Sequence, residues 1–267
     1  MQVAGIPRRL EGKVALITGA SGTNSIGRSI ALRFGAEGAK VGVLDIDVAG
    51  AGLVAEEIVM TGGEAMAIAC DIAVFDQCEA AAGTLAQAFG GRIDILVNNA
   101  ATFKGPVSAY PPRPFDEWTT EEWDHILSVN LRGMWFCARA VHPYMKPLGY
   151  GKIINISSST LWEGVGTLVP YVSSKGGVIG FTRSLARALG PEGIRVNALA
   201  PGFTLTATNL DQPGVGGMAE HIREGQCLTE RNELADDLAG PAFFLASADS
   251  DFMSGQTLLV DGGLNFH

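Results

Sequence analysis

Short apolar runs alternate with longer amphipathic stretches along the whole chain. Seven runs, apolar at successive positions, predict strands at residues 13–18, 40–45, 65–71, 93–98, 152–157, 194–200 and 257–260. Strands that are apolar on both faces belong in a buried parallel sheet. Helical periodicity between them covers residues 26–34, 75–89, 121–146, 171–189 and 234–246, among others. Because these stretches are long enough for right-handed crossovers, the pattern predicts a doubly wound α/β fold with about seven parallel strands and helices on both faces.

No repeat, low-complexity tract or shift in composition divides the 267 residues, so we expect a single domain over residues 1–267. Thr119 and Glu122 form a possible capping box that would start the third predicted helix. Two irregular segments interrupt the pattern, a proline-rich loop at 110–114 and a glycine-containing stretch at 203–229. By its position, the second is the better candidate for a lid over a substrate.

Composition and charge narrow the class of protein. The chain is 47% hydrophobic and 18% charged, with 35 glycines, which fits a globular protein with many tight turns. A net charge of −9 argues against nucleic acid or an anionic membrane as a partner. The four cysteines and four histidines form no metal-binding motif, and no apolar run approaches the length of a signal peptide or membrane span. We therefore expect no metal site and a cytoplasmic protein with reduced thiols.

The turn after the first predicted strand has the context of a dinucleotide site. It reads Thr18-Gly19-Ala20-Ser21-Gly22-Thr23-Asn24-Ser25-Ile26-Gly27 and leads directly into a helix. Glycine allows the backbone to turn sharply beside a pyrophosphate, and the amides at a helix start favour an anion. The fold is therefore expected to be Rossmann-like.

Asp45 closes the second predicted strand, where the acidic residue of such a fold accepts hydrogen bonds from the adenosine ribose. A carboxylate at this position would repel the additional phosphate of NADP. No Lys or Arg lies between Gly19 and Gly27 to bind that phosphate. The predicted cofactor is NAD, although Asp45 could instead be only a turn residue.

Several motifs in order resemble the short-chain dehydrogenase/reductase family from Gly12 to Gly263. They are the glycine-rich turn, Asp71, Asn98-Asn99-Ala100, Asn130, Ser158, Tyr171-Val172-Ser173-Ser174-Lys175, Pro201-Gly202 and Asp261-Gly262-Gly263. One departure is that the turn is two residues longer than usual and has Ser25 where the middle glycine is expected. This spacing is similar to the enoyl-acyl-carrier-protein reductase branch, but the three residues between Tyr171 and Lys175 favour the alcohol/ketone branch. We expect the hydroxyl or amide of Ser25 to contact the phosphates.

Tyr171 and Lys175, four residues apart on a predicted helix, share one face. A free tyrosine has a pKa of about 10, and a nearby ammonium would favour its phenolate. The resemblance makes Tyr171 the acid/base, Lys175 also a ligand of the nicotinamide ribose, and Ser158 the hydroxyl that holds the substrate oxygen. It makes Asn130 the anchor of a proton-relay water.

The resemblance also implies the remaining cofactor contacts. Asn98 and Ala100 would line the adenosine side of the groove, Asp71 and Ile72 the adenine, and Pro201, Thr204 and Thr206 the nicotinamide and diphosphate. Gly19, Ser25, Ile26 and Asp45 complete the predicted set.

Residues after Ser158 and after Pro201-Gly202 would line the substrate pocket. They are Leu161, Trp162, Val165, Leu168, Phe203, Leu205 and Met218. With Trp162 and Phe203 beside Ser158 and Tyr171, the expected substrate is a hydrophobic or aromatic secondary alcohol or its ketone. A finer resemblance, to bacterial phenylethanol-type dehydrogenases, agrees with this expectation.

Other functions remain open at this point. They are sugar, polyol or cyclic diol dehydrogenase, 3-oxoacyl reductase, and, in another class, a non-catalytic NAD-binding protein. The resemblance implies a homotetramer in which the helices carrying Asn130 and Tyr171 form one interface.

Overall fold

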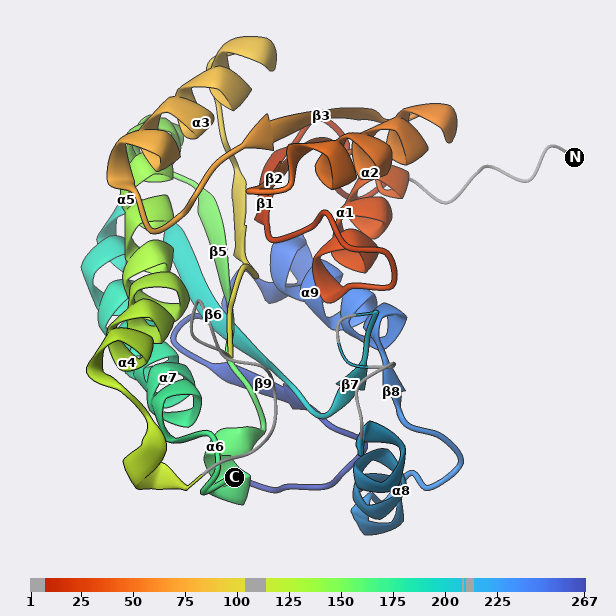
Figure 1. The fold of residues 1–267 in the computed structure, drawn as a ribbon. Coiled ribbons are helices and arrows are strands. Elements are labelled where there is room, and N and C mark those ends of the chain that lie inside the picture. Colours follow the sequence, from red (N-terminus) through yellow and green to blue (C-terminus); the bar gives the residue numbers. More distant parts are fainter. Residues whose placement is uncertain (1–7, 104–113, 208, 210–213) are drawn as a thin grey trace, which may run out of the picture.

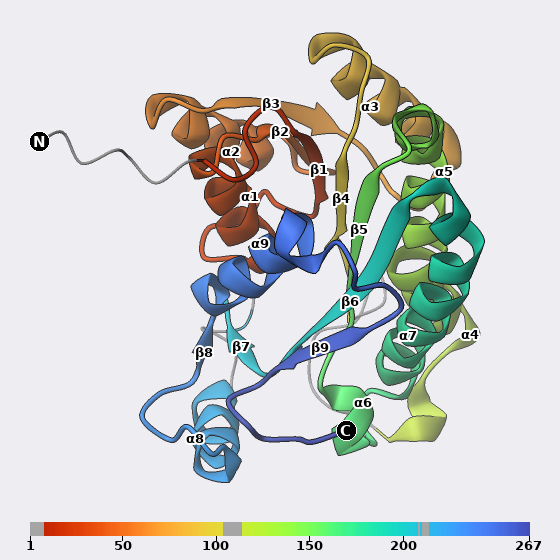
Figure 2. The same ribbon diagram turned by 180° about the vertical axis from the view of Figure 1, so that it is seen from behind.

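Seven parallel strands form one sheet in the order β3-β2-β1-β4-β5-β6-β9 (Figures 1 and 2). They are β1 (Val14–Thr18), β2 (Lys40–Asp45), β3 (Glu64–Ala69), β4 (Ile95–Asn98), β5 (Gly151–Ile156), β6 (Ile194–Pro201) and β9 (Thr257–Val260). The chain moves outward from β1 to β3 and then returns to β4 on the other side of β1. At such a reversal, ligands of α/β proteins bind beyond the carboxyl ends of the strands.

The computed structural model describes residues 8–103, 114–207, 209 and 214–267. Most of the predicted proline-rich loop at 110–114, and positions 208 and 210–213 of the predicted lid, lie outside this range.

Helices cover both faces of the sheet (Figures 1 and 2). One layer consists of α1 (Ile26–Ala36), α2 (Val48–Met60) and α9 (Ala239–Ala246), and the other of α3 (Phe75–Ala88), α4 (Thr120–Leu127), α5 (Gly133–Met145) and α7 (Val169–Leu189). The prediction of a doubly wound, Rossmann-like domain with seven parallel strands is confirmed.

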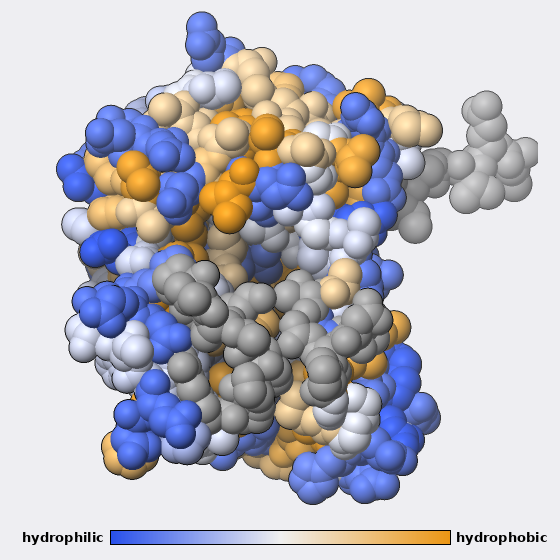
Figure 3. All heavy atoms as spheres, viewed as in Figure 1, coloured by the Kyte–Doolittle hydropathy of each residue, from blue (hydrophilic) through white to orange (hydrophobic). Residues whose placement is uncertain are grey.

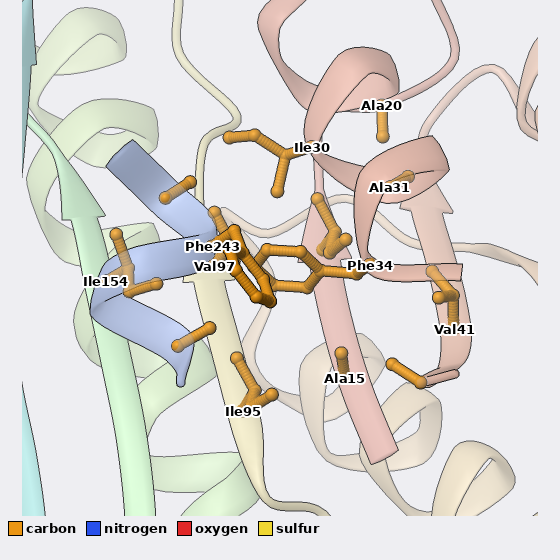
Figure 4. Packing of buried hydrophobic residues seen from close by; sticks show 14 of the residues in the cluster. Ala15, Ala20, Ile30, Ala31, Phe34, Val41, Ile95, Val97, Ile154 and Phe243 are labelled. Carbon is orange, nitrogen blue, oxygen red and sulfur yellow. The ribbon is translucent and has the colours of Figure 1, made fainter. Parts of the chain in front are cut away.

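Each face of the sheet has its own apolar core. Figure 4 shows Phe34 of α1 and Phe243 of α9 among side chains of the central strands, including Ile95 and Val97. A second cluster, on the side of α3 and α5, includes Leu85 and Val141. Successive strand residues thus enter opposite cores, which explains why the strands are apolar without alternation.

Two predicted helices are interrupted. The capping box of Thr119 and Glu122 starts α4 as predicted, but α4 ends at Leu127 and a π-helical turn, η2 (Ser128–Arg132), separates it from α5. The predicted helix at 234–246 begins later, because β8 (Glu233–Leu234) and the 3-10 turn η5 (Ala235–Leu238) take up its first residues.

The predicted lid contains the short strand β7 (Thr204–Leu205) and the helix α8 (Val215–Gly225). β7 pairs in parallel with β8, through Thr204 with Glu233 and Leu205 with Leu234. In Figure 1, α8 stands apart from the main sheet, below this two-stranded ladder. The pairing of β7 with β8 therefore brings together the two ends of the segment that contains α8.

The surface is mixed in character. In Figure 3, hydrophobic residues gather in the upper half of the face, above the grey atoms, and hydrophilic residues cover much of its left and lower rim. Within the described ranges, no helix is long and apolar enough to cross a membrane.

Candidate active site

The turn after β1 is packed so closely that two glycines are required. Gly19 has φ +68°, and a Cβ there would lie 2.5 Å from the Cα of Ala100. A Cβ on Gly27 would lie 2.5 Å from the carbonyl oxygen of Gly19. The turn, the first residues of α1 and the loop after β4 therefore touch through their backbones.

Thr18 and Asn99, neither of which was predicted to have a role, hydrogen-bond these loops together. Thr18 Oγ1 accepts hydrogen bonds from the amides of Asn99 and Ala100, both at 3.0 Å. Asn99 Nδ2 donates to the carbonyl oxygens of Thr18 (3.0 Å) and Gly19 (2.7 Å). The sequence shows two consecutive asparagines, Asn98 and Asn99, but it does not show that only Asn98 is fully buried.

Ser25 is the N-cap of α1. Its hydroxyl accepts from the amide of Arg28 (3.3 Å) and donates to the carbonyl oxygen of Gly22 (2.8 Å). The hydroxyl is thus committed to the turn. Of the two phosphate contacts predicted for Ser25, by its hydroxyl or by its amide, we therefore expect the amide contact, together with the amide of Ile26 at the start of the helix.

Asp45 lies at the carboxyl end of β2 and also holds the glycine-rich turn. Its oxygens accept from the amides of Ser21 and Asp47, both at 3.0 Å. Each carboxylate oxygen can accept a further hydrogen bond. Ile46, the next residue, is 76% exposed, so an apolar side chain is available beside this carboxylate.

Two predicted cofactor residues have side chains buried in the protein. Asn98 is fully buried and donates to Asn155 Oδ1 at 2.8 Å, and Ile72 belongs to the core on the α3 side. Their side chains are directed into the protein, so any contact of these two residues with a cofactor would be made by their backbone. Asp71 is exposed and accepts from the amide of Ala73 at 2.9 Å, and Ala100 is partly exposed.

A cavity of about 330 Å³ opens between the carboxyl ends of the strands and α8. It is lined by Ser158, Tyr171 and Lys175, together with Ile26, Asn99, Pro201, Gly202, Phe203, Thr204 and Thr206. The structure therefore brings residues from the glycine-rich turn, β5, α7 and the segment after β6 to one cavity.

Tyr171 and Lys175 come from one face of α7, as their spacing predicted. Lys175 is 1% exposed, and its Nζ lies 5.6 Å from the centre of the Tyr171 ring. The same Nζ donates to the carbonyl oxygen of Ile156 at 2.8 Å. The ammonium is thus fixed beside the tyrosine by the end of β5.

Burial governs the protonation of both residues. It raises the pKa of Tyr171, and a hydrogen bond with Ser158 opposes that rise. Burial also lowers the pKa of Lys175 to about 7, so the lysine is only partly charged at neutral pH. Burial thus opposes both charged forms, the Tyr171 phenolate and the Lys175 ammonium.

Ser158 is the serine whose hydroxyl is oriented toward Tyr171. Its Oγ accepts from the amide (3.3 Å) and hydroxyl (3.0 Å) of Thr160. The neighbouring serines are otherwise engaged, since Ser157 donates to the carbonyl oxygen of Lys175 (2.9 Å) and Ser159 donates to Glu163 (2.6 Å). With both lone pairs of Ser158 occupied by Thr160, its own proton is directed to another acceptor.

Asn130 lies in η2 and is fully buried. Its Nδ2 donates to the carbonyl oxygen of Thr102 (2.7 Å) and to Ser174 Oγ (3.0 Å), and its Oδ1 accepts from the amide of Thr102 (2.7 Å). The side chain therefore joins the loop after β4 to α7.

The predicted substrate residues divide into two groups. Val165, Leu168, Phe203 and Met218 line the cavity, whereas Leu161, Trp162 and Leu205 are not among its lining residues. The Trp162 ring instead lies 4.9 Å from the ring of His267. Trp162 lies on the single-turn helix α6 (Thr160–Glu163), which begins two residues after Ser158. Its ring points toward the C-terminal tail.

Polar side chains that were not predicted also line the cavity. Thr160, Glu163, Thr167 and Asn209 line it beside the apolar residues of α8. In the described part of the chain, no group of three or more His, Cys, Asp or Glu residues could hold a metal ion.

Comparisons with known proteins agree with this geometry. A family model described as "Enoyl-(Acyl carrier protein) reductase" matches residues 19–265. D-threitol dehydrogenase of Mycolicibacterium smegmatis is 34% identical over 255 residues, which cover 96% of this chain and 94% of that protein. The mitochondrial borneol dehydrogenase of Lavandula x intermedia is 35% identical, with 97% and 92% covered. The crystal structure of levodione reductase superposes with a TM-score of 0.85 at 30% identity, covering 94% of this chain and 97% of that one.

Proposed function

Because the chain belongs to the short-chain dehydrogenase/reductase family of oxidoreductases, we propose that it transfers hydride between a secondary alcohol and a ketone with NAD. The observation that carries the proposal is the convergence of Ser158, Tyr171 and Lys175 on one cavity beside the glycine-rich turn. A non-catalytic NAD-binding protein would have no need for this convergence.

The carboxyl edge of the sheet fits a dinucleotide. Side chains at Gly19 and Gly27 would clash with the neighbouring backbone, so the turn stays close to the start of α1, where free amides favour an anion. Asp45 retains acceptor capacity for ribose hydroxyls, and the exposed Ile46 beside it offers an apolar surface to a base. Bound NAD would supply the hydride acceptor for the alcohol.

In alcohol oxidation, Tyr171 accepts the hydroxyl proton of the substrate, and in ketone reduction it returns one. Ser158 donates a hydrogen bond to the substrate oxygen, because Thr160 occupies its lone pairs. Lys175 holds the nicotinamide ribose and shares with the cationic oxidised cofactor the stabilisation of the phenolate. Asn130 anchors a relay water through its backbone carbonyl, since its side chain is engaged.

The substrate proposal is a neutral, largely apolar secondary alcohol, supported by Val165, Leu168, Phe203 and Met218 in the cavity. A polyol or sugar alcohol is the second candidate, favoured by Thr160, Glu163 and Thr167 on the polar side. A screen that monitors NADH absorbance against aryl, terpene and polyol alcohols, ranked by kcat/KM, decides between them. Clear preference for a charged sugar or an acyl thioester would contradict both.

Asp45 is proposed to select NAD over NADP. Hydrogen bonds to a charged group contribute about 1.5–3 kcal/mol, so Asp45→Asn should lower kcat/KM with NAD about 10- to 100-fold and narrow its preference over NADP. The matched control is Asp47→Asn, which removes the same charge two residues later at the N-cap of α2. If the wild-type enzyme already prefers NADPH, the assignment of the cofactor is wrong.

A homotetramer is proposed, with the helices carrying Asn130 and Tyr171 in one interface. A groove of about 1260 Å³ runs between α4, α5 and α7, and apolar residues such as Leu131, Phe181 and the 46% exposed Trp135 line it. Trp135→Glu should yield smaller species in size-exclusion chromatography with light scattering. Met60→Glu, at an 87% exposed site on α2, should leave the mass unchanged.

A further inference from the structure

A buried carboxylate lies directly behind the wall of the active-site cavity. Glu233 of β8 is only 6% exposed. Its oxygens accept hydrogen bonds from the amide of Gly202 (3.2 Å) and from the hydroxyl of Thr204. The segment that follows β6 is thus held from behind by an ionisable group.

The surroundings of Glu233 contain other acids. Asp237 of η5 and Asp261 after β9 both raise the pKa of its carboxyl, and Arg231 is already paired with Asp237. No ion pair to Glu233 occurs among the residues that the structure describes. Burial raises the pKa of Glu233 to about 7, against the effect of its hydrogen bonds with Thr204 and Gly202.

Only one layer of residues separates this carboxylate from the site of reaction. Gly202 and Thr204, which bind Glu233, line the same cavity as Tyr171 and Lys175. In the proposed function, the nicotinamide occupies this cavity. Its ring carries a positive charge when oxidised and none when reduced.

We propose that the charge of Glu233, which Gly202 and Thr204 hold beside the cavity, makes this site favour the oxidised cofactor over the reduced one. The inference rests on the proposed function. A negative charge in a poorly solvated site attracts the cationic ring of the oxidised nicotinamide. It has no such attraction for the reduced ring, which is neutral. The difference favours use of the enzyme as an alcohol dehydrogenase, because the oxidised cofactor is the reactant in that direction.

The test measures Kd for NAD⁺ by calorimetry and for NADH by fluorescence, with the full chain at pH 8. In Glu233→Gln, the ratio of Kd for NAD⁺ to Kd for NADH should rise severalfold, because a unit negative charge is removed from the poorly solvated surroundings of the cationic ring. Glu233→Asp, which keeps the charge, should retain the wild-type ratio. So should the matched control Glu230→Gln, at an exposed residue of the preceding loop.

The pH dependence supplies a readout that a purely structural role would not produce. In the wild-type protein the preference for NAD⁺ should decline as pH falls from 8 to 6, because Glu233 becomes protonated. Lys175, which lines the same cavity, also titrates near pH 7, since burial lowers its pKa. Its contribution persists in Glu233→Gln, so the difference between the two pH profiles reports Glu233.

Two outcomes would overturn the inference. Equal weakening of NAD⁺ and NADH binding in Glu233→Gln would make Glu233 a structural support only, and an unchanged ratio together with an unchanged pH profile would remove its role altogether. Failure of the wild-type protein to bind either dinucleotide would instead overturn the proposed function.

Discussion

Replacing Tyr171 by Phe is expected to reduce kcat by about 10²–10⁴-fold, the usual contribution of a positioned acid or base. The phenol lines the cavity and hydrogen-bonds with Ser158, and removal of one oxygen should leave the packing of α7 intact. The melting temperature and the Kd for NAD should therefore stay close to their wild-type values. Stopped-flow measurement of NADH formation checks the chemical step directly.

Tyr144→Phe provides the matched control, because this tyrosine lies on α5 and does not line the cavity. It should retain wild-type turnover. Near-normal turnover in Tyr171→Phe would rule out the proposed mechanism, whatever the substrate proves to be.

Replacing Gly19 by Ala is expected to destabilise the protein by about 2–5 kcal/mol and to abolish measurable NAD binding. The positive φ of +68° costs an L-residue energy, and the new Cβ would lie 2.5 Å from the Cα of Ala100. A left-handed conformation costs roughly 1–2 kcal/mol and overpacking about 1–3 kcal/mol, which together give this range. Urea denaturation measures the free energy of unfolding, and calorimetry measures the cofactor affinity.

Gly52→Ala is the control for this substitution. Gly52 lies within α2 without a positive φ, and no atom lies within 4 Å of its added Cβ. Alanine is favoured over glycine in a helix, so this variant should be about 0.5–1 kcal/mol more stable than the wild type. A Gly19→Ala variant as stable as Gly52→Ala would show that the turn can move away from the loop after β4.

The fold was predictable because its determinants are local. The runs that form β2 and β9 are apolar on successive positions, and their predicted bounds agree with the observed strands. The interruption at η2 was not predictable, since the residues around Asn130 keep a helical pattern and the π-helical turn depends on their contacts with Thr102 and Ser174.

The candidate site was predictable where one element carries several of its residues. Tyr171 and Lys175 converge because they occupy one face of α7. Trp162 could not be placed in the same way, because α6 is a single turn whose direction depends on packing against the C-terminal tail. Nothing in the sequence indicated that Glu233 lies beside the active site, since its hydrogen bond with Thr204 joins residues 29 positions apart.

The parallel ladder between β7 and β8 has a consequence for engineering. In this ladder, two residue pairs, Thr204 with Glu233 and Leu205 with Leu234, connect the two chain segments that flank residues 206–232. Since Ser158 follows β5 and Tyr171 and Lys175 lie on α7, outside this interval, we expect an exchange of the interval to leave the proton-transfer residues in place. Grafting the corresponding stretch from a relative of different substrate range, with both residue pairs retained, would change selectivity while leaving the acid/base apparatus in place.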